Sequence, residues 1–390
     1  MNHRQMLNTV QKNLGYRELV YNVKTDEFFM KTPGDNYAVV DIAFGQTLGL
    51  PKGSSSERPI DPQVGDIFWD VDTGSMVIWD GLEWVSMGGG DPGTSGINWK
   101  AGPELPSYDW TGLAYGGGAF VITSANNEVM YSIDGTHWIA VQPPQNNTWG
   151  ALTFGGGQFV AVARNGTNRV MTSPDGRTWT LAPPVDDYAW VGVACGNGKY
   201  VAVAEGRAMY SDDGISWTSV AVSANKWQSI AYGRDKFVAT AKSGTNRIMY
   251  SSDGVSWTQT AAADETADCR AIAFGNPSGS ISDGRFVTVS VDGTNRASYS
   301  DDGINWTATD ATSEDYWYGV AYGDNKFVAV SSGPGSNRVM YSDDGVNWTA
   351  TQGDQDTSGW RAVAYGRNMF IASAAAGSDN SLMYSIREAL

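Results

Sequence analysis

Ser342-Asp343-Asp344-Gly345-Val346-Asn347-Trp348 is one copy of a motif, Ser-x-Asp-Gly-x-x-Trp, around which the chain is organised. A short acidic side chain accepts hydrogen bonds from the backbone amides of a turn, and glycine adopts the positive φ that hairpins need. The tryptophan that follows is expected to bury its ring between layers. Each copy, here called a turn box, is therefore predicted to be a hairpin turn with a structural aspartate. The six copies are 132–138, 173–179, 211–217, 251–257, 300–306 and 342–348, and their aspartates are Asp134, Asp175, Asp213, Asp253, Asp302 and Asp344.

The turn boxes close a longer repeat in which four strand-forming runs follow one another. The box tryptophans at 138, 179, 217, 257, 306 and 348 are spaced by 41, 38, 40, 49 and 42 residues, a period typical of propeller blades. The longest spacing reflects an insertion around 276–283. The first strand of the repeat occurs seven times, at 110–115, 149–154, 190–195, 227–232, 269–274, 317–322 and 360–365. An all-β, seven-bladed propeller of four-stranded blades is predicted.

The seventh repeat ends near Ser385 without a fourth strand, which would leave an open sheet edge. A segment that could supply the missing fourth strand precedes the first repeat. Gly96-Ile97-Asn98-Trp99-Lys100 matches the end of a full unit, with Ser95 in the place of the aspartate. We therefore expect residues 96–102 to form the outer strand of the last blade and to close the ring.

The remaining sequence predicts a second domain. Residues 1–90 contain a helical pattern over about 1–20, short β-rich runs over 19–44 and a meander of three strands over 65–85. Residues 91–95 are a Gly-rich linker, and 96–390 form the propeller. The exposed aromatic residues predicted in this domain favour docking to a partner or self-association. These residues are Phe28, Phe29, Trp69, Trp79 and Trp84.

Composition narrows the classes of function. Lys and Arg number 26 against 42 Asp and Glu, giving a net charge of −16, which disfavours nucleic acid as a partner. Cys195 and Cys269 fall in different repeats and are expected to be unpaired fillers. The N-terminus lacks the apolar core of a secretory signal, and no apolar run is long enough for a membrane helix, so a soluble protein is expected.

Two resemblances follow from these motifs. The repeat over 96–390 resembles the Asp-box, or BNR, propellers, which include sialidases, sortilin-like receptors and the photosystem II assembly factor. The segment Gly65 to Val85 resembles small β-meanders of bacteriophage tail-fibre and other virion proteins. The first resemblance implies a fold more than an activity, since the motif is shared by unrelated functions.

A sialidase would imply an arginine cluster with a Tyr and Glu pair on the face opposite the boxes. No Arg-Ile-Pro motif occurs, and Arg169, Arg247, Arg296 and Arg338 share one repeat position, which favours a structural role. With only His3 and His137, no His-based triad or His-rich metal site is predicted. The Asp-Asp pairs, such as Asp301-Asp302, lack the spacing of a calcium loop. No enzyme activity, cofactor or metal is therefore expected.

The residues at the head of the first strands form a candidate ligand face. In related propellers this strand end lies away from the boxes, where aromatic rings would stack on sugars or grip a peptide. The alternative is that each ring packs beneath the crossover between blades. The residues are Trp110, Trp149, Trp190, Trp227, Trp317 and Trp360, with Cys269 as the exception.

Together these observations predict a non-enzymatic bacteriophage virion protein, assembled in the host cytoplasm, whose propeller recognises a host-surface glycan or protein in adsorption. Residues 1–90 would dock on other virion proteins or form a homo-oligomer. Recognition is expected to use the loops between blades, at 142–148, 183–187, 261–268, 310–316 and 353–359. The alternatives are a cellular assembly factor resembling the photosystem II propeller and a sialidase-like glycan hydrolase.

Overall fold

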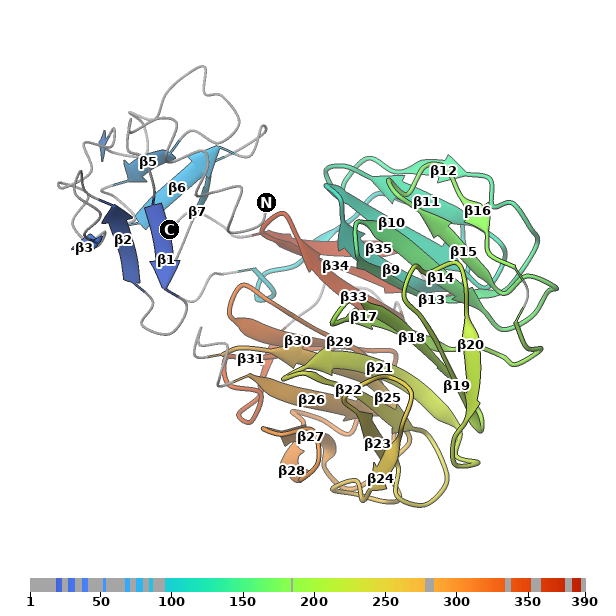
Figure 1. Cartoon of the computed structure of the whole chain (residues 1–390). Coiled ribbons are helices and arrows are strands. Elements are labelled where there is room, and N and C mark those ends of the chain that lie inside the picture. Colours follow the sequence, from blue (N-terminus) through green and yellow to red (C-terminus); the bar gives the residue numbers. More distant parts are fainter. Residues whose placement is uncertain are drawn as a thin grey trace. The chain divides into compact units, whose positions relative to one another are not determined.

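The computed structural model divides the chain into two compact units, Met1–Asp91 and Pro92–Leu390, which are described separately (Figure 1). The helix expected over about 1–20, residues 91–94 of the linker and most of the loop at 353–359 lie outside the described residues. In the first unit the structure describes the backbone of residues 19–22, 27–31, 37–40, 52–53, 67–70, 75–79 and 84–86. In the second unit it describes 95–183, 185–277, 284–333, 338–351, 359–375 and 381–386.

The first unit contains two small sheets. Strands β1 (Leu19–Asn22), β2 (Glu27–Lys31) and β3 (Tyr37–Val40) pair in chain order. The second sheet has the order β4-β5-β6-β7, where only β4 and β5 are parallel. Its last three strands form the meander predicted over 65–85. The bounds are Lys52–Gly53, Ile67–Asp70, Ser75–Trp79 and Trp84–Ser86.

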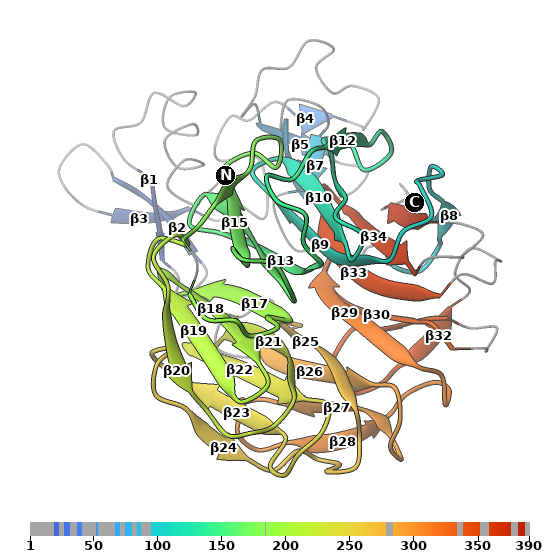
Figure 2. The same cartoon turned by 90° about the vertical axis from the view of Figure 1, so that its right-hand side faces the viewer.

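The second unit is a seven-bladed propeller, as the repeat predicts. All regular elements among its described residues are strands, and each blade is a four-stranded antiparallel sheet. Figure 2 shows the blades following one another in chain order around a central axis. The innermost strands are β9 (Trp110–Gly116), β13 (Trp149–Gly155), β17 (Gly192–Gly196), β21 (Trp227–Gly233), β25 (Cys269–Gly275), β29 (Trp317–Gly323) and β33 (Trp360–Gly366).

The other strands of each blade lie successively farther from the axis. The second strands are β10 (Ala119–Ser124), β14 (Gln158–Ala163), β18 (Lys199–Ala204), β22 (Lys236–Ala241), β26 (Arg285–Ser290), β30 (Lys326–Ser331) and β34 (Met369–Ala374). The third strands are β11 (Val129–Ser132), β15 (Val170–Ser173), β19 (Arg207–Ser211), β23 (Ile248–Ser251), β27 (Arg296–Ser300), β31 (Val339–Ser342) and β35 (Leu382–Ile386). The outer strands are β12 (Ile139–Val141), β16 (Thr180–Leu181), β20 (Thr218–Ala221), β24 (Thr258–Thr260), β28 (Thr307–Asp310), β32 (Thr349–Thr351) and, in the last blade, β8 (Lys100–Ala101).

The ring closes through the segment predicted for this purpose. Strand β8 pairs antiparallel with β35, so that Lys100 lies opposite Tyr384. The Gly96 amide donates to Ser385 Oγ over 2.7 Å, and Trp99 Nε1 donates to the Gly96 carbonyl over 3.1 Å. Both bonds have counterparts in the first turn box, at 2.8 and 3.1 Å. The last blade therefore contains a turn box assembled from two distant parts of the chain.

Neighbouring blades pack through buried second strands and through a glycine at the end of each inner strand. A Cβ atom on Gly116 would lie 1.9 Å from the Phe154 ring of the next blade, and one on Gly366 would lie 2.1 Å from Tyr115 of the first blade. Only glycine permits this close approach. The same contact thus spans the closure between the last and first blades, and explains why the inner strands end in glycine.

Candidate binding site

The antiparallel order of each blade separates two faces of the propeller. The first strand leads through a hairpin to the second, and the third leads through a turn box to the outer strand, so these turns share one face. The crossovers between blades and the beginnings of the inner strands lie on the opposite face, here called the loop face. The loops expected to recognise a partner therefore surround the start of the inner strands.

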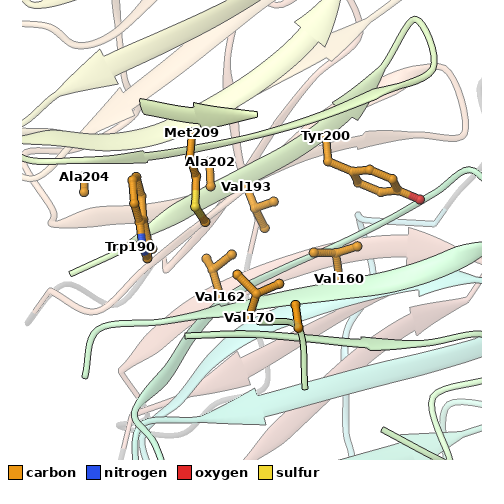
Figure 3. Close-up of a cluster of buried hydrophobic side chains, with 10 residues drawn as sticks. Val160, Val162, Val170, Trp190, Val193, Tyr200, Ala202, Ala204 and Met209 are labelled. Atoms are coloured by element: carbon orange, nitrogen blue, oxygen red, sulfur yellow. The ribbon is translucent and has the colours of Figure 1, made fainter. Parts of the chain in front are cut away.

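The tryptophans predicted to offer a stacking surface are buried. The side chains of Trp110, Trp149, Trp190, Trp227, Trp317 and Trp360 are 0–2% exposed. The Nε1 atoms of Trp110, Trp227 and Trp317 donate to carbonyls of the preceding crossover over 3.1–3.2 Å. Figure 3 shows Trp190 packed in the core beside Met209. The prediction of an aromatic ligand face at these residues is wrong, because each ring packs beneath a crossover, as the alternative interpretation expects.

The aspartates of the six turn boxes are engaged in local hydrogen bonds. In each box one Oδ1 atom accepts from the amides two and three residues later, over 2.7–3.2 Å. The box serine accepts from the glycine amide over 2.8–2.9 Å. The box tryptophans are less buried than expected: Trp179 is buried, but the other five are half-buried, because the outer strands are solvent-exposed edges.

Three arginines of the repeat position donate hydrogen bonds to backbone carbonyls of their own loop or of the following crossover. Arg169 Nε donates to the Gly166 carbonyl over 3.0 Å, and Arg247 Nη1 to the Ala267 carbonyl over 2.6 Å. Arg296 Nη1 bonds the carbonyl of Asp315 over 2.9 Å. These contacts fit the structural role expected from their repetition.

A basin of about 470 Å³ opens on the loop face, where the seven inner strands begin. In every blade, the residue that follows the strand-head tryptophan, or Cys269 in the fifth blade, lines this basin. These residues differ from blade to blade: Thr111, Gly150, Val191, Gln228, Arg270, Tyr318 and Arg361. Two residues further along, all seven blades contribute an aliphatic side chain. These are Leu113, Leu152, Val193, Ile230, Ile272, Val320 and Val363, which form an apolar ring below the variable one.

Three arginines meet in this basin. The Cζ atoms of Arg361 and Arg270 lie 3.9 and 5.2 Å from the ring centroid of Tyr318, in cation–π contact. Arg164, at the end of β14, lines the same basin beside Gly150, where a Cβ atom would lie 3.1 Å from its Nε. Glycine in that blade therefore leaves room for the Arg164 side chain.

The electrostatics of the basin reflect this grouping of like charges. Partial desolvation by the basin wall, followed by the positive charges of Arg270 and Arg361, lowers the pKa of the Arg164 guanidinium, whereas Asp109 opposes this shift. Arg270 forms an ion pair with Asp268 over 2.6 Å. Within the described part of the chain, no hydrogen bond reaches the guanidinium of Arg164 or Arg361. The two groups are therefore available to an anion.

Sequence reasoning did not predict this cluster. Arg270 and Arg361 occupy one repeat position, but the other blades carry unrelated residues there, and Arg164 comes from a different strand. The available signal was the variation at a single position of an otherwise uniform strand. Repeat positions that are free of folding constraints are those at which a recognition site can diverge.

The described residues contain no group of three or more His, Cys, Asp or Glu side chains placed to hold a metal ion. Cys195 and Cys269 are free thiols, and burial raises the pKa of Cys269 to about 12. No helix among these residues has the length and hydropathy for crossing a membrane.

Comparisons with known proteins define the class as a propeller. The model of the DUF6242 beta propeller domain matches residues 151–270. The fold is similar to virginiamycin B lyase from Staphylococcus aureus, with a TM-score of 0.62 and 13% identity over 74% of this chain and 99% of that one. It is also similar to YCF48 bound to D1 peptide, with a TM-score of 0.57 and 16% identity over 74% and 97% of the two chains. A search of curated proteins finds no match. At these identities the similarity extends to the fold alone.

Proposed function

We propose that the protein is a bacteriophage virion component whose propeller recognises a host-surface glycan or protein without turnover. The observation that carries the proposal is the basin on the loop face, where the variable residues of the repeat converge. Concave sites of this size that combine apolar walls with a few polar groups are typical of ligand binding. The meander over 65–85, which resembles virion proteins, supports the virion assignment.

Recognition is favoured over hydrolysis by the composition of the basin. The resemblance to sialidases implies a Tyr and Glu pair beside an arginine cluster. Among the described residues that line the basin, Tyr318 is present but Asp109 is the only carboxylate. Guanidinium groups and amides bind and orient a ligand, whereas hydrolysis of a glycosidic bond commonly needs two carboxyl groups.

The first experiment measures binding of the whole protein to host-surface extracts. Tyr316 lies in the 310–316 loop and is 48% exposed, and Ile133, on the turn-box face, is also 48% exposed. We expect Tyr316→Ala to weaken binding and Ile133→Ala to leave it unchanged. Equal binding by both folded variants would oppose recognition through the loop face. Absence of the protein from purified virions would oppose the virion assignment.

A glycan hydrolase is the second candidate, because three arginines and a tyrosine meet on the face away from the boxes. This candidate is tested by incubating the protein with host glycans and measuring free sugar. Sugar release that is abolished in Tyr318→Phe would establish turnover and replace the binding assignment. A cellular assembly factor remains the third candidate, because YCF48, which shares the fold, has been solved bound to a peptide.

A further inference from the structure

We propose that the fifth blade binds one water molecule in its core, beside Cys269, where the other six blades have a strand-head tryptophan. The site is a cavity of about 20 Å³ between the crossover at 261–268 and strands β26, β27 and β28. None of its lining residues belongs to the basin. The inference therefore goes beyond the proposed function.

Comparison with the other blades explains the cavity. In each of the six, the strand-head tryptophan packs in the same core cluster as a methionine of the third strand, as Trp317 does with Met340. The fifth blade has Cys269 and Ser298 at these two positions, and neither side chain belongs to an apolar core cluster of the described residues. Two large apolar groups are thus replaced by two small ones, which leaves unfilled space in the blade.

The lining of the cavity is polar as well as small. Thr288 on β26 stands where the other six blades have alanine or isoleucine, and it is 2% exposed. Its hydroxyl shares a hydrogen bond of 2.8 Å with the hydroxyl of Ser298. Two hydroxyls have two protons and this bond uses one, so the other proton has no acceptor among the described residues. Polar cavities satisfy such a group with water, whereas empty cavities are apolar.

The volume of the cavity selects the ligand. About 20 Å³ exceeds the roughly 10–15 Å³ that one water molecule needs, and it is too small for a molecule of several heavy atoms. Arg296 also lines the cavity, and its Nε atom is buried without an acceptor in the described structure. A buried water makes about two to four hydrogen bonds, and hydroxyls accept as well as donate, so these groups can supply its partners.

The crossover above the site is held by carboxylates instead of an aromatic ring. Glu265 Oε1 accepts from the amides of Ala262 and Arg247 over 2.6 and 3.2 Å. Asp264 Oδ2 accepts from the Thr294 amide over 2.9 Å. The water would occupy part of the space that a tryptophan ring fills beneath the other crossovers. Movement of this crossover would therefore displace a water molecule and not a buried ring.

The test is a crystal structure of the whole protein at a resolution that shows ordered water. We expect one water molecule within hydrogen-bond distance of the hydroxyl of Thr288 or Ser298. The double variant Thr288→Val with Ser298→Ala removes both hydroxyls and should lose this water. Thr240→Val is the matched control and should retain it. Thr240 is a fully buried second-strand residue of the fourth blade, its hydroxyl makes no hydrogen bond, and it does not line the cavity.

Four results would overturn the inference. Absence of ordered water density from the cavity of the natural protein would show that the lining does not bind water, and density for a larger molecule would contradict the size limit. A water that persists in the double variant would show that the hydroxyls do not hold it. Its loss in Thr240→Val would show that it does not depend on the cavity lining. The proposed function is tested separately, by the binding of host extracts.

Discussion

At the scale of single residues, the aspartates of the turn boxes connect folding to pH. Hydrogen bonds from the amides of Ser216 and Ile215 lower the pKa of Asp213 to about 2, and those from Ser256 and Val255 do the same for Asp253. The ordinary value for this side chain is 3.8. A carboxyl group whose pKa is lowered by folding stabilises the folded state only while it is ionised. These boxes therefore contribute stability above pH 4 that is lost as the pH falls toward 2.

The prediction is that urea unfolding measured from pH 7 to pH 2 will show stability decreasing mainly below pH 4. Asp213→Asn keeps a side-chain oxygen acceptor but removes the charge, so it should be less stable than the natural chain at pH 7 and approach it near pH 2. Asp343→Asn, beside the last box aspartate, is the control because its side chain makes none of these turn bonds. A difference between the Asp213 variant and the natural chain that stays constant with pH would contradict the prediction.

At the scale of strands and blades, the two families of tryptophans differ in what they stabilise. Trp317 is fully buried between β26, β30 and the crossover that precedes it, and Nε1 bonds the Ser313 carbonyl over 3.2 Å. Trp348 is half-buried at the outer edge of its blade, and its Nε1 atom has no hydrogen-bond partner in the described structure. The interior of a blade interface therefore depends on the strand-head tryptophan more than on the box tryptophan.

We accordingly predict that Trp317→Ala will lower the free energy of unfolding by about 3 to 5 kcal/mol, through an aromatic-sized cavity. Trp348→Ala should cost less, because solvent or neighbouring side chains can occupy the vacated edge. Chemical denaturation of both variants, under conditions in which the natural chain unfolds reversibly, measures the difference. An equal or larger cost for Trp348→Ala would refute this ranking.

At the scale of the whole molecule, the ring is closed in the last blade. There the closing strand β8 is held to β35 by noncovalent contacts only. Ser95 is buried and donates to Asp324 Oδ2 over 2.5 Å, which ties the closing segment to the sixth blade. Gly96 has φ of +86°, and a Cβ atom there would lie 2.6 Å from Val328 Cγ2. The closing segment is therefore held by neighbours on two blades, and a side chain at Gly96 would force Val328 to move.

This closure predicts different effects for two glycine substitutions. Gly96→Ala and Gly118→Ala both place alanine at positive φ, but Gly118, with φ of +82°, has no atom within 4 Å of the added Cβ. Only the first should weaken the pairing of β8 with β35. Hydrogen exchange should show lost protection in β35 for Gly96→Ala alone, together with the lower melting temperature. Similar exchange in β35 for the two variants would argue against the closure.

The propeller fold could be predicted from the sequence because the same blade pattern recurs along the chain. Six turn boxes and seven inner strands give the blade count, and the match between residues 96–100 and a repeat ending gives the closure. The basin could not be predicted in the same way. Arg164, Arg270 and Arg361 belong to three different blades, and their proximity arises only when the ring is formed. The burial of the strand-head tryptophans also depends on the crossovers that cover them.

The turn box assembled across the closure has a consequence for the order of the chain. Ser385, Ile386, Ser95 and Gly96 occupy the four successive positions that Ser132, Ile133, Asp134 and Gly135 fill in the first box. A peptide bond from Ile386 to Ser95 would therefore restore the natural spacing of the motif. Such a circular permutant, with new termini in the open hairpin between Gly117 and Gly118, would retain the blades, their pairing and the basin. The architecture of the ring therefore does not depend on the blade in which the polypeptide begins.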